Sequence, residues 1–484
     1  MNTLYNKLKH YDKSDYYGFH MPGHKRKLEL FDNPFRIDIT EIEGFDDLHH
    51  PQAHGVLVRA QERAAMLYGS QETHFLVNGS TAGILSAVLG CTSPGGSILI
   101  SRNCHRSVYH GIALQNLRAL YVYPQQEPNM WINGSILPED VDTMLNKHPD
   151  IQAVLITSPT YDGICSDLEE IGRITHKRGI PLLVDQAHGA HFPFHAYFPA
   201  DGICQGADVV IHSVHKTLPS LTQTALLHLN GNLVDRDKIR NYLSVFQTSS
   251  PSYVLMASLD SCMEFLQVHG QEAFDRQVTL LKEFHRECED LQRIKVMNDQ
   301  IRDGRLVWDV DVSRLLCWAK DTCWTGVELG ERLREDYHLQ MEMSTCTYTL
   351  GISSVSDTKE GFCRLKEALF QLDKRAEKGE VSRLEKAGSK ILSGVSVDGP
   401  SWLPRLQASI SIGKAFHRQK EIVSEKEALG RTAGAFVYVY PPGIPLVAPG
   451  EILTEEVLEY LSYWRSYGME IQGIHEDGKI CVLK

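Results

Sequence analysis

The sequence predicts an α/β protein with a mostly parallel central sheet, a smaller α/β domain and a C-terminal segment. Short, apolar and β-branched segments alternate with helical ones over the first half of the chain, a pattern typical of parallel sheets. Polar side chains follow the ends of these expected strands, where a parallel sheet binds its ligand. With 484 residues, 42% hydrophobic and 23% charged, the chain is long enough for two or three domains.

Composition argues against several functions. The net charge of −12 argues against general nucleic-acid binding, and no apolar run approaches the roughly 20 residues of a membrane span. The first residues lack the apolar core of a signal peptide, so we expect a cytoplasmic protein. The chain has 11 cysteines and no Cys-x-x-Cys pair, which argues against a disulfide framework or a zinc ribbon.

The chain begins with an irregular segment, residues 1–55, rich in Gly, Pro, His and Asp. It contains His20-Met-Pro-Gly-His-Lys25 and Asp46-Asp-Leu-His-His-Pro51, whose roles the sequence leaves open. A helix is expected from Val56 to Tyr68, where Gly69-Ser70 ends it.

The expected major domain covers residues 56–300. A strand at 73–77 runs into Asn78-Gly-Ser-Thr-Ala-Gly83 and an apolar helix, a geometry that points backbone N–H groups and hydroxyls at a phosphate. The turn is neither G-x-G-x-x-G nor a Walker A loop, which disfavours a dinucleotide or a nucleoside triphosphate. Further strands are expected at 97–100, 119–122, 153–157, 182–184, 209–211 and 225–229, with helices such as 168–178 between them and helices over 253–294.

Two of these strand ends carry a carboxylate and a lysine. The strand 182–184 ends in Asp185, and the strand 209–211 leads to Ser213-Val-His-Lys216. A lysine amine can form a Schiff base with pyridoxal phosphate (PLP), and an aspartate can keep the pyridine nitrogen protonated so that the ring accepts electrons. Either residue alone is better interpreted as a solvated lysine or a helix cap. Both together, with polar groups at the other strand ends, predict a PLP site.

A second alternating region, residues 301–375, predicts a smaller α/β domain. Its strands are expected at 306–310, 315–318, 340–343 and 348–352. Residues 376–400 are charged and then rich in Gly and Ser, as expected of a linker. Residues 401–484 form the expected C-terminal domain.

The motifs that carry the strongest resemblance occur in one order along the chain. They are Gly79-Ser80-Thr81, Asn103-Cys-His-Arg-Ser107, Asp185-Gln-Ala-His188, Ser213-Val-His-Lys-Thr217, Gln247-Thr-Ser-Ser-Pro251 and Tyr440-Pro-Pro-Gly-Ile-Pro445. In these motifs the chain closely resembles the Orn/Lys/Arg decarboxylase family, PLP-dependent enzymes of fold type I, the aspartate-aminotransferase fold. The likeness covers nearly the whole chain, which is similar to the shorter form of that family.

The resemblance implies a role for each matching residue. Lys216 is expected to hold PLP, Asp185 to pair with the pyridine nitrogen, Ala187 to pack under the ring and His105 to stack on its opposite face. Gly79, Ser80, Thr81, Ser213 and His215 are expected around the phosphate. Thr248 is expected to reach the phosphate of the neighbouring subunit, which implies a homodimer with active sites at the interface and leaves a higher oligomer open. Glu342 matches a position used towards the substrate's distal cation.

The implied reaction is PLP-dependent decarboxylation of a basic L-amino acid to its amine and CO₂, a step that feeds polyamine synthesis. Arginine is the first expected substrate, followed by lysine or ornithine. Lys216 or His188 is expected to return a proton to Cα, and the sequence does not decide between them. Long-form members often have Trp at the position of His188, so their substrate preference does not carry over.

Two other functions and a metal site agree less well with the sequence. An aminotransferase or C–C lyase shares the fold, but an aminotransferase needs an arginine clamp for which the sequence gives no clear candidate. A non-catalytic PLP-fold regulator is disfavoured because Lys216 and Asp185 are both intact. His188, His191 and His195 have ligand-like spacing, as do His49, His50 and His54, but no Cys or carboxylate pattern completes either group, so no metal is predicted.

Overall fold

The fold is described from a computed structural model. It describes residues 3–28, 30, 33–50, 52–127, 130–319, 322, 324–376, 403–439, 443–466, 469–475 and 477–484. The linker predicted at 376–400 therefore lies outside the described residues except for Ala376, as do Tyr440, Pro441 and Pro442 of the last motif. Among the described residues, no helix is both long and apolar enough to cross a membrane.

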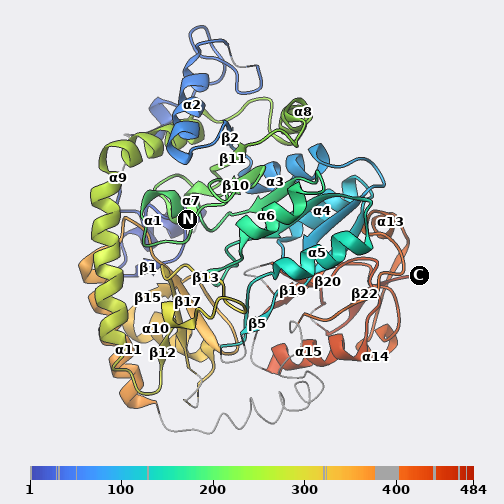
Figure 1. The fold of residues 1–484 in the computed structure, drawn as a ribbon. Helices are drawn as coiled ribbons and strands as arrows, with labels where there is room; N and C mark the ends of the chain where they lie inside the picture. Colours follow the sequence, from blue (N-terminus) through green and yellow to red (C-terminus); the bar gives the residue numbers. More distant parts are fainter. Residues whose placement is uncertain are drawn as a thin grey trace.

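A seven-stranded sheet forms the centre of the larger part of the molecule (Figure 1). Its strand order is β2 (Glu72–Leu76), β11 (Ala225–Leu229), β10 (Val209–His212), β9 (Leu182–Asp185), β7 (Ile151–Thr157), β3 (Ser97–Ser101) and β4 (Arg118–Val122). β11 runs antiparallel to both of its neighbours, and the remaining pairs are parallel. The carboxyl ends of the other six strands therefore meet at one edge of the sheet, as predicted.

Helices cover both faces of this sheet because its strands are apolar on both sides. They are α2 (Val56–Tyr68), α3 (Gly79–Gly90), α4 (Arg106–Leu114), α5 (Pro138–Lys147), α6 (Leu168–His176), α7 (Val214–Thr217) and α8 (Arg236–Phe246). Several begin at the caps that the sequence supplies, such as Asp167, whose carboxylate accepts from the backbone N–H of Glu170. The helix predicted at 56–68 is confirmed with the same bounds.

A 36-residue helix, α9 (Tyr253–Cys288), runs along one side of the molecule past both sheets (Figure 1). It leads to a four-stranded antiparallel sheet in the order β12 (Lys295–Val296), β14 (Arg314–Trp318), β17 (Tyr348–Ile352) and β16 (Met343–Ser344). Helices α10 (Gly326–Tyr337) and α11 (Lys359–Arg375) accompany this sheet. The strand predicted at 348–352 is confirmed.

Two strand predictions in this region are wrong in extent. Of the segment 306–310, only β13 (Asp309–Val310) is a strand, and it pairs with β8 (Ile164–Cys165) of the larger part. Leu306 does not belong to a strand. Its carbonyl accepts a hydrogen bond from the backbone N–H of Ser135. The segment 340–343 is divided at Glu342 into β15 (Leu339–Met341) and β16, which belong to different sheets.

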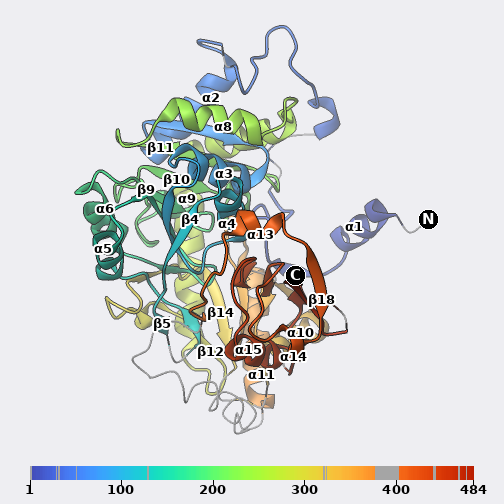
Figure 2. The same ribbon diagram turned by 90° about the vertical axis from the view of Figure 1, so that its right-hand side faces the viewer.

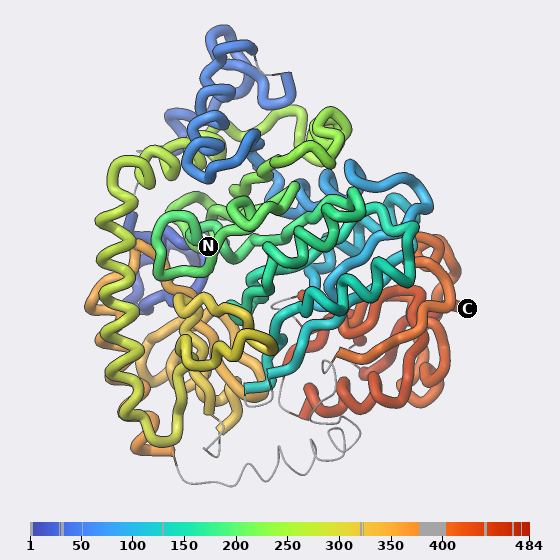
Figure 3. The backbone as a smooth tube through the Cα atoms, in the orientation of Figure 1, coloured from blue at the N-terminus to red at the C-terminus, as the bar shows by residue number. Residues whose placement is uncertain are grey.

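The N-terminal segment contains α1 (Leu4–Asp12), β1 (Tyr17–Phe19) and the short 3₁₀ helix η1 (Pro34–Arg36). β1 pairs in parallel with β15, with Tyr17 opposite Leu339. Figure 3 shows this dark blue segment beside the yellow and orange part of the chain, far from its neighbours in sequence. α1 projects from the molecule (Figure 2), and none of its residues is buried.

The C-terminal elements lie against the larger part through α13 (Ile412–Phe416), which packs on α4 (Figure 2). They form a three-stranded sheet of β20 (Ile444–Val447), β19 (Val437–Val439) and β21 (Ile471–Gln472), and a pair of β18 (Lys420–Val423) with β22 (Ile480–Leu483). The helices here are α14 (Glu425–Ala428) and α15 (Glu455–Ser466).

Arg102 follows β3 and is fully buried. It joins the central sheet to the C-terminal elements. Its guanidinium donates to the carbonyls of Pro445 and Leu446 at 2.6 and 2.9 Å and lies 3.3 Å from the carboxylate of Glu451. It also donates to the hydroxyl of Tyr109 at 2.7 Å. One buried cation therefore holds the start of the C-terminal sheet to the end of a central strand.

Candidate active site

A cavity of about 420 Å³ lies at the carboxyl ends of the central strands. Apart from Thr248, every site residue predicted from the sequence lines it: Gly79, Ser80, Thr81, His105, Asp185, Ala187, His188, Ser213, His215, Lys216 and Glu342. Thr248 is exposed in the turn after α8. Residues more than 260 positions apart in the sequence are thus brought together in one cavity.

The start of α3 forms an anion site in this cavity. Gly79 has a φ of +73°, which lets β2 turn directly into the helix. The preceding residue, Asn78, makes no side-chain cap, so the first backbone N–H groups of α3 remain available to a ligand. The hydroxyls of Ser80 and Thr81 line the same wall, and the hydroxyl of Ser213 is buried with no hydrogen-bond partner among the described residues. These donors fit the phosphate of PLP.

Lys216 and Asp185 come from neighbouring strands. Asp185 ends β9, beside Ile211 of β10, and Lys216 lies on the short helix α7 that follows β10. The Nζ of Lys216 is 2.9 Å from Nε2 of His188. One carboxylate oxygen of Asp185 accepts from the backbone N–H of Ala187 at 3.2 Å. The amine and the carboxylate thus face a common space, as PLP binding requires.

Burial shifts the protonation of these groups. It lowers the pKa of Lys216 to about 8, although the charge of Asp185 acts in the opposite direction. It raises the pKa of Asp185, against the influence of Lys216. It also lowers the pKa of His105 to about 3 and that of His188 well below its usual value. Both imidazoles are therefore neutral at physiological pH, which suits His105 to stacking and lets Nε2 of His188 accept a hydrogen bond from Lys216.

Glu342 lies on the small-sheet side of the cavity, between β15 and β16. The hydroxyl of Tyr161 donates to one of its carboxylate oxygens at 2.6 Å, and the backbone N–H of Met21 donates to the other at 2.9 Å. The ring of Tyr161 also packs against His188, with 4.5 Å between centroids. The cavity therefore contains a carboxylate fixed by two hydrogen bonds in addition to the lysine.

Several cavity residues were not identified from the sequence. They include Met21, Pro22, Asn103, Thr157, Pro159, Tyr161, Thr222 and Ile444. The sequence leaves the role of the segment 20–25 open, and it assigns no role to the residues that follow the strand 153–157. Arg314 was missed entirely. It is fully buried behind the cavity and donates to the carbonyl of His188 at 2.7 Å.

The histidines with ligand-like spacing have separate partners. His188 contacts Lys216, while Nε2 of His191 lies 3.4 Å from Asp311 and Nε2 of His195 lies 3.2 Å from Asp275. Within the described ranges, no cluster of three or more His, Cys, Asp or Glu side chains has an arrangement suited to a metal ion.

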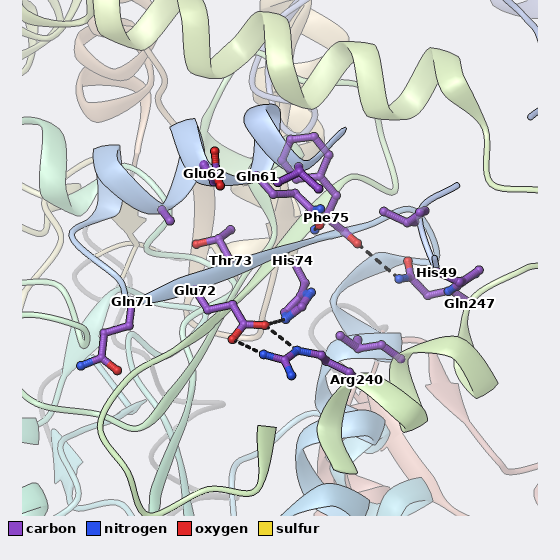
Figure 4. Close-up of a pocket in the computed structure, with 14 residues that line it drawn as sticks. His49, Gln61, Glu62, Gln71, Glu72, Thr73, His74, Phe75, Arg240 and Gln247 are labelled. Carbon is purple, nitrogen blue, oxygen red and sulfur yellow. Dashed lines mark hydrogen bonds and ion pairs between the residues drawn. The ribbon is translucent and has the colours of Figure 1, made fainter. Parts of the chain in front are cut away.

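A second cavity, of about 360 Å³, lies beside the edge strand β2 (Figure 4). Glu72 points towards His74 and Arg240 there, at 2.7 Å from each. The side-chain amide of Gln247 completes the exposed edge of β2: it accepts from the backbone N–H of Val77 at 2.8 Å and donates to the carbonyl of Phe75 at 3.2 Å. Gln247 thus fixes the end of β2 that leads into the anion site.

We expect Gln247→Ala to weaken PLP binding although Gln247 does not line the first cavity. The change removes the side-chain partners of the Phe75 carbonyl and the Val77 N–H, which costs about 1–3 kcal/mol. Because Val77 lies two residues before Gly79, we expect the start of α3 to shift and the Kd for PLP to rise roughly tenfold. Equilibrium titration of the apoprotein with PLP measures this. Gln71→Ala, in the same cavity but exposed, serves as the control. An unchanged Kd for PLP in the Gln247 variant would contradict the assignment.

The fold and this cavity define the class of protein. A lysine and an aspartate on neighbouring strand ends face an anion site at a helix start, in a mostly parallel sheet with a second, smaller sheet. This is the arrangement of a PLP-dependent enzyme of fold type I.

Comparison with known proteins identifies the family. The family model described as Orn/Lys/Arg decarboxylase, major domain, matches residues 2–324, and the model for the C-terminal domain of the same family matches residues 403–479. An arginine decarboxylase of Halalkalibacterium halodurans is 33% identical over 467 residues, 95% of this chain and 92% of the relative. The arginine decarboxylase of Bacillus subtilis is 31% identical over 490 residues, 99% and 97% of the two chains. The chain therefore belongs to the Orn/Lys/Arg decarboxylase family.

Solved structures agree with the fold. Lysine decarboxylase A from Pseudomonas aeruginosa has a TM-score of 0.77 and 20% sequence identity, covering 92% of this chain and 73% of its own. The lysine decarboxylase of Francisella novicida has a TM-score of 0.73 and 19% identity, covering 99% and 80%. The α/β fold predicted from the sequence is confirmed.

Proposed function

We propose that this chain is a PLP-dependent decarboxylase of a basic L-amino acid, with arginine as its main substrate. The observation that carries the proposal is a single cavity lined by Lys216, Asp185 and the Glu342 carboxylate. Arginine is favoured as the substrate because relatives named arginine decarboxylase align over nearly the full length of both chains. Lysine and ornithine are the next candidates.

The residues around the cofactor divide its binding between them. The first turn of α3, with Ser80, Thr81 and Ser213, holds the phosphate, and His215 contributes to the same wall. Lys216 forms the covalent link, and Asp185 keeps a proton on the pyridine nitrogen. PLP, when bound, supplies the electron sink for the pair of electrons left on Cα when CO₂ departs. Ala187 and His105, which both line the cavity, would pack on the two faces of its ring.

The remaining residues handle the substrate and the proton. Glu342 binds the distal cation, and its two hydrogen bonds from Tyr161 and Met21 fix where that cation can lie. Lys216 and His188, 2.9 Å apart, share a proton that either can deliver to Cα. The buried cavity favours loss of CO₂ because the charge is localised on the carboxylate before the step and dispersed after it.

Assembly and cellular role complete the proposal. Thr248, exposed in the turn after α8, would reach the phosphate site of a second subunit, which makes the enzyme a homodimer with its active sites at the interface. The amine product would enter polyamine synthesis in the cytoplasm.

The direct test is to supply arginine, lysine and ornithine separately to the PLP-loaded protein and to measure CO₂. We expect CO₂ release, with arginine giving the highest kcat/KM of the three. Bound PLP without CO₂ from any of the three would favour an aminotransferase or C–C lyase, which 2-oxo acid acceptors and aldehyde products would reveal. Bound PLP without any turnover would favour a non-catalytic PLP-fold regulator. No PLP binding would refute the enzyme function.

The pKa of Lys216 gives a pH prediction. Only the neutral amine can attack PLP, so the rate of covalent capture by the apoprotein should rise about tenfold per pH unit below the pKa of about 8 and level off above it. An unperturbed lysine would instead keep rising to a pH above 10. Stopped-flow absorbance of PLP binding between pH 6 and 10 distinguishes these two profiles.

A further inference from the structure

The segment His20-Met-Pro-Gly-His-Lys25 lies across the candidate active site, and the proposed function leaves most of it without a role. Met21 and Pro22 line the cavity together with Lys216 and Glu342. The strand that precedes them, β1, is fixed to β15 by parallel pairing from Tyr17 to Phe19. The segment therefore follows directly from the two-stranded sheet of β1 and β15, and Glu342 follows β15.

Two backbone N–H groups of this segment donate to residues that line the cavity. The N–H of Met21 donates to the carboxylate of Glu342 at 2.9 Å. The N–H of Gly23 donates at 2.8 Å to the carbonyl of His215, the residue before Lys216. Three consecutive residues thus connect the carboxylate proposed for the distal cation with the turn that carries the lysine.

The contact at Gly23 is too close for any larger residue. A Cβ on Gly23 would lie 2.6 Å from the carbonyl oxygen and 2.7 Å from the backbone nitrogen of Leu218, so either the segment or the lysine turn would have to move. The hydroxyl of Ser354 donates to the carbonyl of Gly23 at 2.6 Å. The glycine backbone is therefore held between the lysine turn and Ser354, which follows β17.

Lys25 fixes the C-terminal end of the segment to its first residue and to β17. Its ammonium is buried and donates to the carbonyl of His20 at 2.9 Å and to the carbonyl of Ile352, at the end of β17, at 2.7 Å. Burial lowers the pKa of this amine, in line with a structural rather than a solvated lysine. The segment is thus a tight loop fixed at both ends rather than a mobile cover.

We propose that the segment 20–25 is a specificity determinant that sets the length of the basic side chain the enzyme accepts. It fixes the position of Glu342 relative to the Lys216 turn, and the side chains of Met21 and Pro22 form the wall between them. The inference rests on the proposed function, because it assigns the distal cation to Glu342. Arginine, lysine and ornithine differ in the reach and shape of their cations, and one methylene can change kcat/KM by roughly 10–200-fold.

Gly23→Ala and Met21→Ala test this proposal. The first displaces the segment, and the second keeps the N–H to Glu342 but shortens the wall, so it tests the inference even if the first variant folds poorly. For both we expect the ratio of kcat/KM between the preferred and the second substrate to fall about tenfold or more. The Kd for PLP should stay unchanged in Met21→Ala, which leaves the backbone contact between Gly23 and the lysine turn in place. Gly270→Ala is the matched control, because a Cβ there meets nothing closer than Leu266 at 3.8 Å.

A second readout separates this inference from the proposed function. The Kd values of agmatine, cadaverine and putrescine, the amines corresponding to the three substrates, are measured on the PLP-loaded proteins by calorimetry. A change in the order or spacing of these Kd values supports the inference even if the wild type releases no CO₂, an outcome that would refute the proposed function alone. If the kcat/KM values of all substrates change by one common factor in both variants, and the Kd values of all amines do the same, the segment does not set specificity and the inference is wrong.

Discussion

Lys216→Ala is expected to lower kcat by at least about a thousandfold, because the variant loses both the covalent link to PLP and one of the two groups able to return a proton to Cα. His188 remains in place, but its partner at 2.9 Å is gone. The phosphate donors of α3 and the hydroxyl of Ser213 are unaffected, so the variant should still bind PLP noncovalently. The measurement is CO₂ release together with the absorbance of bound PLP, which should change to that of the free aldehyde.

Lys177→Ala is the control for this change, since Lys177 is exposed at the end of α6 and far from the cavity residues in the sheet. Its activity and absorbance should equal those of the wild type. If Lys216→Ala keeps covalently bound PLP, another lysine holds the cofactor and the assignment of the site is wrong. Treatment with borohydride followed by peptide mapping would then locate that lysine.

Arg102→Leu is expected to destabilise the junction with the C-terminal sheet by about 3–5 kcal/mol, the usual cost of breaking a buried ion pair on one side. The variant leaves Glu451 buried without its cation, and burial already raises the pKa of that carboxyl. The carbonyls of Pro445 and Leu446 lose their donors as well. Hydrogen exchange of residues 443–451 and urea denaturation measure the loss.

Arg118→Leu gives the matched control, because Arg118 forms an ion pair with Asp150 in which both side chains are more than half exposed. Such a pair contributes about 1 kcal/mol or less. Replacing Glu451 as well as Arg102 by Leu should recover part of the stability, since no uncompensated charge then remains. If the Arg102 and Arg118 variants lowered the free energy of unfolding equally, Arg102 would not be a structural junction.

The central sheet could be predicted because its strands are short, apolar and buried on both faces. The segments at 182–184, 209–211 and 225–229 are strands with nearly the expected bounds. The failures concern strands whose pairing is decided by distant partners. Residues 306–308 look like a strand in composition, but Leu306 and Trp308 bond to Ser135 instead. The apolar run around Glu342 gave no sign that it would be shared between two sheets.

The candidate site could be predicted at the strand ends, since the parallel topology alone brings Asp185 and Lys216 together. Tyr161 and Met21 could not, because their roles depend on contacts with Glu342 that span 181 and 321 residues of sequence. Arg314 was hidden for the same reason: its bond to the carbonyl of His188 involves a backbone group, which has no signature in sequence. The part of the cavity formed by Tyr161, Met21 and Glu342 thus follows only from the tertiary structure.

The long sequence separation between the segment 20–25 and its partners also bears on biosynthesis. Met21 leaves the ribosome 321 residues before Glu342, an interval of roughly 15–60 s at ordinary translation rates. Throughout that time β1 has no β15 to pair with, while the central strands up to β11 are already available to fold. The nascent protein can therefore fold the central strands that carry Asp185 and Lys216 first. The part of the site around Glu342 becomes complete only when β1 pairs with β15.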